Sequence, residues 1–323
     1  MTDQIGIWEH ARYLTRRKEH GYCTDDNARA LIVCCRQQDH EPGVDRLSGI
    51  YLNFIIGAAL ESGGFHNRRA GDGSWEDEVG SEDSQGRALW ALGTVSRVGS
   101  RVGMRDASAD MFTRMAGHFE SSALRSNAFA MLGAAEVLEQ QPDHRGALTL
   151  MAAGVGVIGI GGQGGWPWPE PRLAYDNARL PEALIAAGEC LGDSGLTDAG
   201  LRLLAWLVEI EMRNDRFSFV GANGWAPGEP RPGFDQQPVE AGAMADACFR
   251  AWKLTGEPEW RDRLESAVLW FLGRNDSSTR LYDPRTGGCC DGLTAVGANR
   301  NQGAESTVSA LMALQRWAAV SGE

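Results

Sequence analysis

The feature of this sequence that most constrains its fold is a short polar cluster that recurs. In its first copy, residues 25–29 (DDNAR), two acids, an amide and an arginine open a run of small and apolar residues. A similar order returns in residues 82–89 (EDSQGRAL) and again in residues 176–180 (DNARL). Thr24 or Asp25 is a suitable N-cap, and acids suit the positive end of a helix dipole. The repetition predicts several helices of one kind whose starts carry the same chemistry.

The repeat continues along the whole chain with a period typical of helical hairpins. Between the segments that begin with these polar clusters lie five longer amphipathic runs. They cover residues 47–61, 106–119, 144–158, 197–212 and 259–271, and we expect a sixth at residues 5–17. Small residues dominate the segments that begin with the polar clusters, which predicts inner helices packed closely on every side. The sequence therefore predicts one all-α domain over residues 1–323, an (α/α)6 barrel with inner and outer helices. The six segments rich in Ala, Gly and Leu start near Asp25, Glu82, Ser126, Asp176, Glu240 and Glu305, roughly 45 to 65 residues apart.

The connections between the predicted helices are unequal. Those that return from an outer to an inner helix are long and rich in Gly, Trp and acids, at residues 63–81, 161–175, 215–238 and 277–302. Long, chemically rich loops at one end of a scaffold are where function usually lies. All of them lead into inner-helix N-termini, so we expect one face to gather the functional residues.

Composition and charge exclude several classes of function. A net charge of -12 argues against nucleic-acid binding, which depends on Lys and Arg neutralising phosphates. The sequence contains no stretch of about 18 apolar residues, so no membrane span is expected. The first residues lack the basic and apolar pattern of a signal peptide, so a cytoplasmic location is expected. The seven cysteines, with two adjacent pairs, are then expected to be reduced thiols.

Several local strings resemble known protein families. The six-hairpin pattern, with acids and aromatics at the inner-helix starts, resembles the (α/α)6-barrel glycosidase superfamily. The strings GIWEHARY, HGYCTDDNARAL, SEDSQGRALWALG, YDNARLPEAL and NQGAESTVSAL resemble a domain often found behind a glycosyltransferase domain in bacterial sugar-metabolism proteins. The resemblance implies carbohydrate chemistry and no specific substrate. We expect an oligosaccharide substrate and no metal or organic cofactor, with a glycosyltransferase as the candidate partner. The resemblance does not identify the acid and the base.

The carboxylates at the predicted inner-helix starts are the candidate catalytic residues. Glycoside hydrolysis normally needs one carboxylic acid to protonate the leaving oxygen and one carboxylate as base or nucleophile. The alternative is that these acids cap their own helices. We expect Asp25 and Glu305 to form the acid/base pair of a hydrolase, with inversion implied by the resemblance. Glu82, Asp83, Asp176 and Glu240 are the further candidates.

Amides, aromatics and histidines complete the predicted site. Amides make directional hydrogen bonds to hydroxyls, and indole rings stack on the C–H faces of sugars. The repeated Arg29, Arg87 and Arg179 have an alternative role, because buried ion pairs that tie neighbouring helices together also need arginine at one level. The predicted substrate-binding residues are Asp26, Asn27, His20, His66, Trp75, Gln85, Trp166, Trp168, Asn177, Trp225 and Gln302.

Three other interpretations stay open at this stage. A sugar epimerase or isomerase would use histidines such as His10, His20 and His66 as its acid and base. A phosphorylase would use the same general acid as the hydrolase. In a non-catalytic glycan-binding module the carboxylates would only cap helix N-termini. A zinc site at Cys289, Cys290 and a histidine is disfavoured, because no C-x-x-C or H-E-x-x-H spacing is present.

Overall fold

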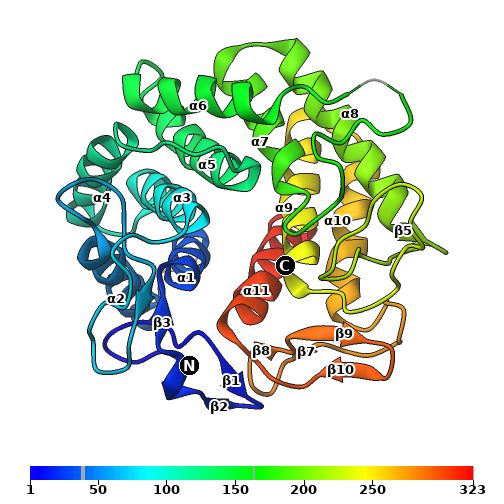
Figure 1. Ribbon diagram of the computed structural model, residues 1–323, viewed down its shortest axis with the longest axis horizontal. Helices are drawn as coiled ribbons and strands as arrows, with labels where there is room; N and C mark the ends of the chain where they lie inside the picture. The colour runs from blue at the N-terminus through cyan, green and yellow to red at the C-terminus, as the bar shows by residue number, and fades with distance from the viewer. Residues whose placement is uncertain (38–40, 163, 323) are drawn as a thin grey trace. The chain divides into compact units, whose positions relative to one another are not determined.

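The computed structural model describes residues 1–37, 41–162 and 164–322, and these are mostly helical (Figure 1). Eleven α-helices and a few two-stranded pairs make up the secondary structure of the described residues. The chain divides into two compact units. The first comprises Met1–His10, Thr15–Ile158 and Ala186–Asp193, and the second comprises Ala11–Leu14, Gly159–Ile185 and Ser194–Glu323.

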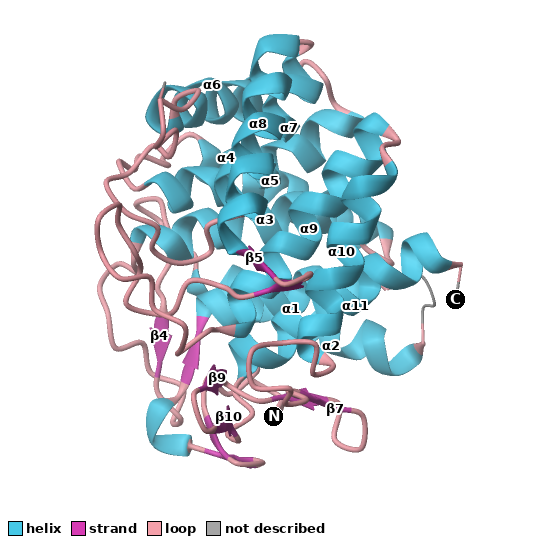
Figure 2. Ribbon diagram, turned by 90° about the vertical axis from the view of Figure 1, so that its right-hand side faces the viewer, coloured by secondary structure: helices cyan, strands magenta, loops and turns pink. Residues whose placement is uncertain are grey.

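Three helical hairpins build the first unit. Within each hairpin the two helices pack together, and α3 also packs against α1 on one side and α5 on the other (Figures 1 and 2). The first helix of each hairpin is the buried one predicted as an inner helix, and the second is amphipathic. The helices are α1 (Thr24–Arg36) with α2 (Pro42–Ala58), α3 (Glu82–Val98) with α4 (Val102–Ala116), and α5 (Leu124–Gln140) with α6 (Arg145–Ile158).

Glycines let the inner helices of the first unit approach backbone to backbone. A Cβ atom added to Gly133 of α5 would lie 2.5 Å from the carbonyl oxygen of Leu89 and 2.8 Å from the Cα of Trp90, both in α3. Gly93 of α3 faces Gly133 in the same way. This confirms that the small residues of these segments serve close helix packing.

The second unit is built from the later helices. In it α9 packs against both α10 and α11. Prolines at the first turn start α9 and α10, and Gly256, with a left-handed φ of 69°, ends α9. The helices are α7 (Arg179–Leu191, of which residues 179–185 belong to this unit), α8 (Ser194–Glu211), α9 (Pro238–Thr255), α10 (Pro258–Phe271) and α11 (Ala304–Ser321).

Short strands occupy the connections between helices. The pair β3–β4 brings the loop that follows α2 beside the start of α1, with Tyr22 opposite Arg69. The strands are β1 (Ala11–Arg12), β2 (Thr15–Arg16), β3 (Tyr22–Cys23), β4 (Arg68–Arg69), β5 (Met212–Arg213), β6 (Arg216–Phe217), β7 (Tyr282–Asp283), β8 (Gly288–Cys289), β9 (Gly292–Thr294) and β10 (Gly297–Asn299), and a short 3₁₀ helix, η1, covers Lys18–His20.

The prediction of a sixth outer helix over residues 5–17 was wrong. This segment contains bends, isolated bridges and the short strands β1 and β2. Ile7 and Trp8 are buried in extended backbone, and Gly6 lies against the Asn27 side chain, where an added Cβ would come within 2.5 Å of its oxygen. Tyr13 has a left-handed φ of 54°, which a continuous helix does not tolerate.

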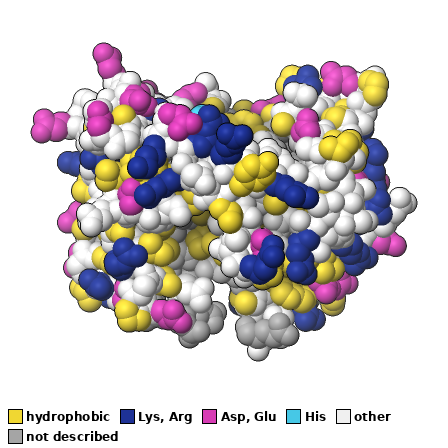
Figure 3. All heavy atoms as spheres, turned by 90° about the horizontal axis from the view of Figure 1, so that it is seen from below, with side chains coloured by type: hydrophobic (Ala, Val, Ile, Leu, Met, Phe, Trp, Pro, Cys, Tyr) yellow, Lys and Arg dark blue, Asp and Glu magenta, His cyan; other side chains and the backbone are white. Residues whose placement is uncertain are grey.

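The surface is chemically mixed. Basic and acidic side chains both lie on the face shown in Figure 3. Within the described residues, no helix combines the length and the apolar character that a bilayer crossing requires. All seven cysteines are free thiols, as predicted, and Cys23, Cys35, Cys248 and Cys289 are buried.

Candidate active site

The start of α1 places Asp25 in the first helical turn, and the loop after α2 holds that turn in position. The Thr24 backbone N–H donates to the side-chain and backbone oxygens of Asn67, at 3.0 and 2.9 Å. The Thr24 hydroxyl donates to the His66 backbone oxygen at 2.6 Å. The cap predicted from Thr24 or Asp25 was wrong: Cys23 precedes the helix without a capping side chain. Asn67 supplies the acceptor from another segment.

Asp25 itself combines partial exposure with an unusual electrostatic setting. Its side chain is 18% exposed, and its Oδ1 atom lies 3.3 Å from Nε of Arg87 in α3. Burial raises the pKa of Asp25. The positive charges of Arg87 and Arg29 oppose that rise, and the negative charge of Asp83 adds to it. The net shift is upward, so this carboxyl keeps its proton at higher pH than an ordinary aspartate.

His66 lies in the same loop and is held on two sides. Its Nδ1 atom is 2.7 Å from the backbone oxygen of Asp77 and 3.5 Å from that residue's carboxylate. A backbone oxygen can only accept, so the neutral ring carries its proton on Nδ1 and leaves Nε2 as an acceptor. The imidazole stacks on Trp75 with centroids 4.9 Å apart, and Arg69 covers Trp75 at 5.1 Å. His66 therefore has a fixed tautomer and a fixed ring orientation.

The two residues that follow Asp25 are engaged by the protein. Asp26 is 3% exposed and pairs with Arg29 at 2.7 Å on the same helix. The Asn27 side chain accepts from the Ile7 backbone at 3.1 Å and donates to the Cys23 backbone at 2.8 Å. These contacts attach the N-terminal segment to α1, and the predicted roles of Asp26 and Asn27 toward substrate stay predictions.

The start of α3 repeats the acidic pattern of α1 and uses it to hold the next loop. Glu82 accepts from the Ser121 hydroxyl at 2.8 Å, and Asp83 accepts from the Ser126 hydroxyl of α5 at 2.6 Å. Glu82 is exposed, whereas Asp83 is half-buried and close enough to Asp25 to raise its pKa. The two carboxylates Asp25 and Asp83 therefore lie close together in the first unit.

Two further predicted residues of this unit make local contacts. Both amide atoms of Gln85 bond the Phe65 backbone, with Oε1 accepting at 2.7 Å and Nε2 donating at 2.8 Å. His20 ends η1, and its ring meets that of His10 edge to face at 4.7 Å. Gln85 thus fixes the loop between α2 and α3, and its role in hydroxyl recognition stays a prediction.

In the second unit, Glu240 at the start of α9 organises the turn before α7. Its carboxylate accepts from the backbone N–H groups of Asp176 and Asn177 and from the Asn177 amide, the last two at 3.1 Å. Asp176 precedes α7 with a left-handed φ of 51°. Burial, Glu211 and Asp176 raise the pKa of Glu240 to about 8, and burial raises that of Glu211 to about 7.

Buried arginines tie neighbouring helices together, as the alternative interpretation predicted for Arg87 and Arg179. Arg179 of α7 pairs with Glu182 at 2.6 Å and with Asp246 of α9 at 2.8 Å. Arg316 of α11 binds the other oxygen of Asp246 at 2.5 Å. Arg87 makes the corresponding link from α3 to α1 through Asp25, as described above.

The loop tryptophans of the second unit pack on one another. Trp166 meets Trp206 of α8 and Trp225 edge to face at 5.1 and 5.5 Å, and Trp168 stacks on Trp206 at 5.9 Å. The Trp166 and Trp225 indoles donate to backbone oxygens, and that of Trp168 donates to the Glu170 carboxylate at 3.2 Å. Their stacking on a sugar stays a prediction.

The last predicted residues lie at the start of α11. Glu305 is in the first turn and is half-buried. The Gln302 side chain accepts from the Thr286 hydroxyl at 3.0 Å, and its backbone N–H donates to the Tyr13 oxygen at 3.0 Å. Among the described residues, no group of three or more His, Cys, Asp and Glu side chains has a geometry that could hold a metal ion.

Sequence reasoning missed three residues with a clear structural role. Asn67 caps α1, Asp77 orients His66, and Glu211 is a buried carboxyl near Glu240. Asn67 and Asp77 lie in the long loop predicted to be functional, which was the available signal. Nothing in the local sequence indicates which loop residue contacts the start of α1. The sequence around Glu211 is that of an ordinary amphipathic helix end.

Comparison with known proteins identifies the fold. No family model and no curated protein sequence matches the chain. Solved structures do: a sugar epimerase from a ruminal bacterium aligns with a TM-score of 0.73 and 12% identity, covering 98% of this chain and 93% of that one. A D-mannose isomerase aligns with a TM-score of 0.68, 10% identity and coverage of 97% and 93%.

A glycosidase structure matches as well. The GH76 alpha-mannanase of Bacteroides thetaiotaomicron aligns with a TM-score of 0.63 and 12% identity, covering 92% of this chain and 86% of that one. These likenesses show the fold, an all-α (α/α)6 barrel, as predicted.

Proposed function

We propose that this chain is an enzyme that acts on carbohydrate, and specifically a glycoside hydrolase in which Asp25 donates the proton to the leaving oxygen. The observation that carries the proposal is the setting of Asp25 at the start of an inner helix. It is partly exposed, its pKa is raised, and a second carboxylate, Asp83, lies close by. Structures with this fold include enzymes named for reactions on sugars, which supports the substrate class.

The raised pKa suits the role of acid. A glycosidic oxygen is a poor leaving group until it receives a proton, so one carboxyl must stay protonated near neutral pH while another stays ionised. Partial burial and the charge of Asp83 favour the protonated form of Asp25. In the proposed step the Asp25 proton passes to the leaving oxygen, the bond from C1 to that oxygen breaks, and water attacks C1.

The second carboxylate activates that water. We propose Asp83 for this role, because it lies close to Asp25 within the first unit, and the role predicted for Glu305 from the sequence stays a prediction. Glu240 and Asp176 are less suited, because both are at most 3% exposed and Glu240 holds the turn before α7. Glu82 is exposed but holds the loop after α4.

Release of reducing ends from oligosaccharides tests the proposal. The panel contains cellobiose, gluco-oligosaccharides and fragments of alpha-mannan, each with and without phosphate. Asp25→Asn should lower the rate by about 10²- to 10⁴-fold, the range for a lost general acid. Asp45→Asn removes an acid from the first turn of the outer helix α2 and should leave the rate unchanged.

Each remaining outcome has a definite meaning. Loss of activity in Asp83→Asn assigns Asp83 as the base, and full activity in that variant would rule Asp83 out. A strict requirement for phosphate makes the enzyme a phosphorylase. Binding of an oligosaccharide by calorimetry with no turnover on any panel member would contradict catalysis and favour the glycan-binding module.

The geometry of His66 favours a second candidate, a sugar epimerase or isomerase. Its Nδ1 proton is fixed by Asp77, so Nε2 is the ring nitrogen that can take a proton from a carbon next to a carbonyl group. An epimerase and an isomerase are among the structures with this fold. In D2O this reaction would place deuterium at C2 of the sugar, and His66→Asn would abolish the exchange.

A further inference from the structure

A pocket of about 260 Å³ lies in the first unit, on the side of α3 that does not face Asp25. Gln85 and Leu89 line it and are four residues apart, so they share one face of the helix. Arg87, which contacts Asp25, is two residues from Gln85 and therefore points about 200° away from it around the helix. The pocket is thus a separate cavity from the proposed active site.

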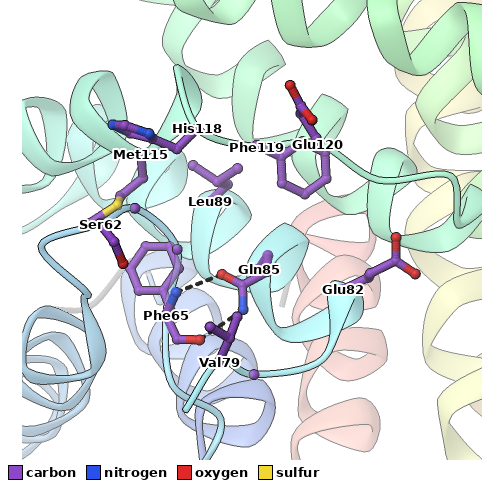
Figure 4. A pocket seen from close by; sticks show the side chains of 13 residues that line it. Ser62, Phe65, Val79, Glu82, Gln85, Leu89, Met115, His118, Phe119 and Glu120 are labelled. Atoms are coloured by element: carbon purple, nitrogen blue, oxygen red, sulfur yellow. Dashed lines mark hydrogen bonds between the residues drawn. The ribbon is translucent and has the colours of Figure 1, made fainter.

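Three segments build the walls of this pocket (Figure 4). They are the loop after α2, the first turns of α3, and the end of α4 with the loop that follows. Gln85 fixes the loop through its two hydrogen bonds to the Phe65 backbone. Gly63, with a φ of 99°, admits the His118 ring, because an added Cβ would lie 2.5 Å from the ring carbon Cγ.

The floor of the pocket is apolar. Phe65, Leu89 and Met115 line it, and each is at most 2% exposed. An apolar floor in a cavity of this volume favours a small hydrocarbon chain or ring. Burying that part of a ligand supplies most of the affinity, since the gain scales with the apolar area removed from water.

The rim of the pocket is acidic. Glu82 and Glu120 line it, and no lysine or arginine is among the lining residues. Glu82 is held by the Ser121 hydroxyl at 2.8 Å, and Glu120 is exposed and makes no ion pair with any residue in the described part of the chain. Two carboxylates without a cation attract a positive charge to the mouth.

We propose that this pocket binds a small organic cation, a primary ammonium or guanidinium group carried on an apolar ring or short chain. The apolar part occupies the floor formed by Phe65, Leu89 and Met115, and the cation lies between Glu82 and Glu120. Phe65 also connects the pocket to the active site, because the next residue, His66, bonds Thr24 at the start of α1.

Titration with benzylamine, benzyl alcohol and benzoate, followed by NMR of the methyl groups of Met115 and Leu89, tests the proposal. Benzylamine should shift these signals and bind about tenfold tighter than benzyl alcohol, since each rim carboxylate contributes up to about fivefold. Benzoate should bind weakest. Equal binding of amine and alcohol, tighter binding of methyl glucoside, or no shift with any probe would overturn it.

Three variants locate the binding. Val79→Trp fills the mouth from an exposed position and should abolish the shifts in a protein with an unchanged circular dichroism spectrum. Glu120→Gln should weaken benzylamine about threefold and leave benzyl alcohol unchanged. Glu61→Gln makes the same charge change on an exposed residue that does not line the pocket, and it should alter neither. Equal weakening by the Glu61 and Glu120 variants would refute a specific rim contact.

Discussion

Replacement of Gly133 by alanine tests the close packing of α3 and α5 directly. In a helix interior, glycine to alanine normally stabilises a protein, because alanine is favoured by about 1 kcal/mol in helix propensity. At Gly133 the added Cβ would lie 2.5 Å from the Leu89 carbonyl oxygen and 2.8 Å from the Trp90 Cα. The steric effect therefore opposes the propensity effect.

The geometry sets the size of the effect. An ordinary contact between carbon and a carbonyl oxygen is about 3.3 Å, so α5 would have to move by about 0.8 Å away from α3. Its neighbours are backbone atoms of a helix and cannot rotate away. Overpacking of this kind costs about 1–3 kcal/mol, and a contact with backbone belongs at the upper end. We expect a net loss of about 2 kcal/mol, or a fall of roughly 3 °C in Tm for a chain of this length.

Thermal unfolding followed by circular dichroism at 222 nm measures this effect against a matched control. Gly49 lies within α2, and an added Cβ there meets nothing within 4 Å. Gly49→Ala should therefore raise the stability by about 1 kcal/mol, from propensity alone. A Gly133→Ala variant as stable as Gly49→Ala would refute the close approach of the two helices.

Three further predictions concern single side chains. Arg179→Met leaves Asp246 and Glu182 without their central partner and should lower the free energy of unfolding in urea by about 3–5 kcal/mol. The exposed Arg202→Met should lower it by less than about 0.5 kcal/mol. Equal losses in the two variants would contradict the network. Glu211 has a folded pKa of about 7 against an ordinary 4.5, so its contribution to stability, present below pH 4.5, is lost as the pH rises through 7. Urea titrations from pH 5 to 7 should show a shallower decline for Glu211→Gln, by up to about 1.4 kcal/mol per pH unit, and unchanged slopes would refute the shift. Asn67→Ala removes the cap of α1 and should lower the free energy of unfolding, measured by thermal denaturation, by about 1 kcal/mol. Replacement of the exposed Asn53 by alanine should leave it almost unchanged.

The fold was largely predictable because its signal is repeated. A cluster such as residues 25–29 says little once, but its return at hairpin spacing predicts the inner helices and their order. The segment over residues 5–17 escaped the prediction because its apolar residues suit either a helix or an extended chain. There tertiary contacts decide, with Gly6 against Asn27 and Tyr13 in a left-handed turn.

The candidate site was only partly predictable. The sequence indicated Asp25 and His66 separately, and it indicated that the loop over residues 63–81 would reach the inner-helix starts. It did not predict that Asn67 caps α1 or that Asp77 fixes the His66 ring, because both contacts depend on how the loop folds back. For Asn27 and Gln85 the sequence predicted hydrogen bonds to sugar hydroxyls, whereas in the structure their side-chain amides bond the protein backbone.

The measurement that tests the central claim most directly is NMR of an oligosaccharide incubated with the enzyme in D2O, with wild type beside Asp25→Asn. Hydrolysis by the proposed mechanism creates new reducing ends, leaves C2 free of deuterium and is lost in the variant while its Tm stays measurable. Deuterium at C2 without cleavage, or cleavage that survives Asp25→Asn at the wild-type rate, would contradict the account.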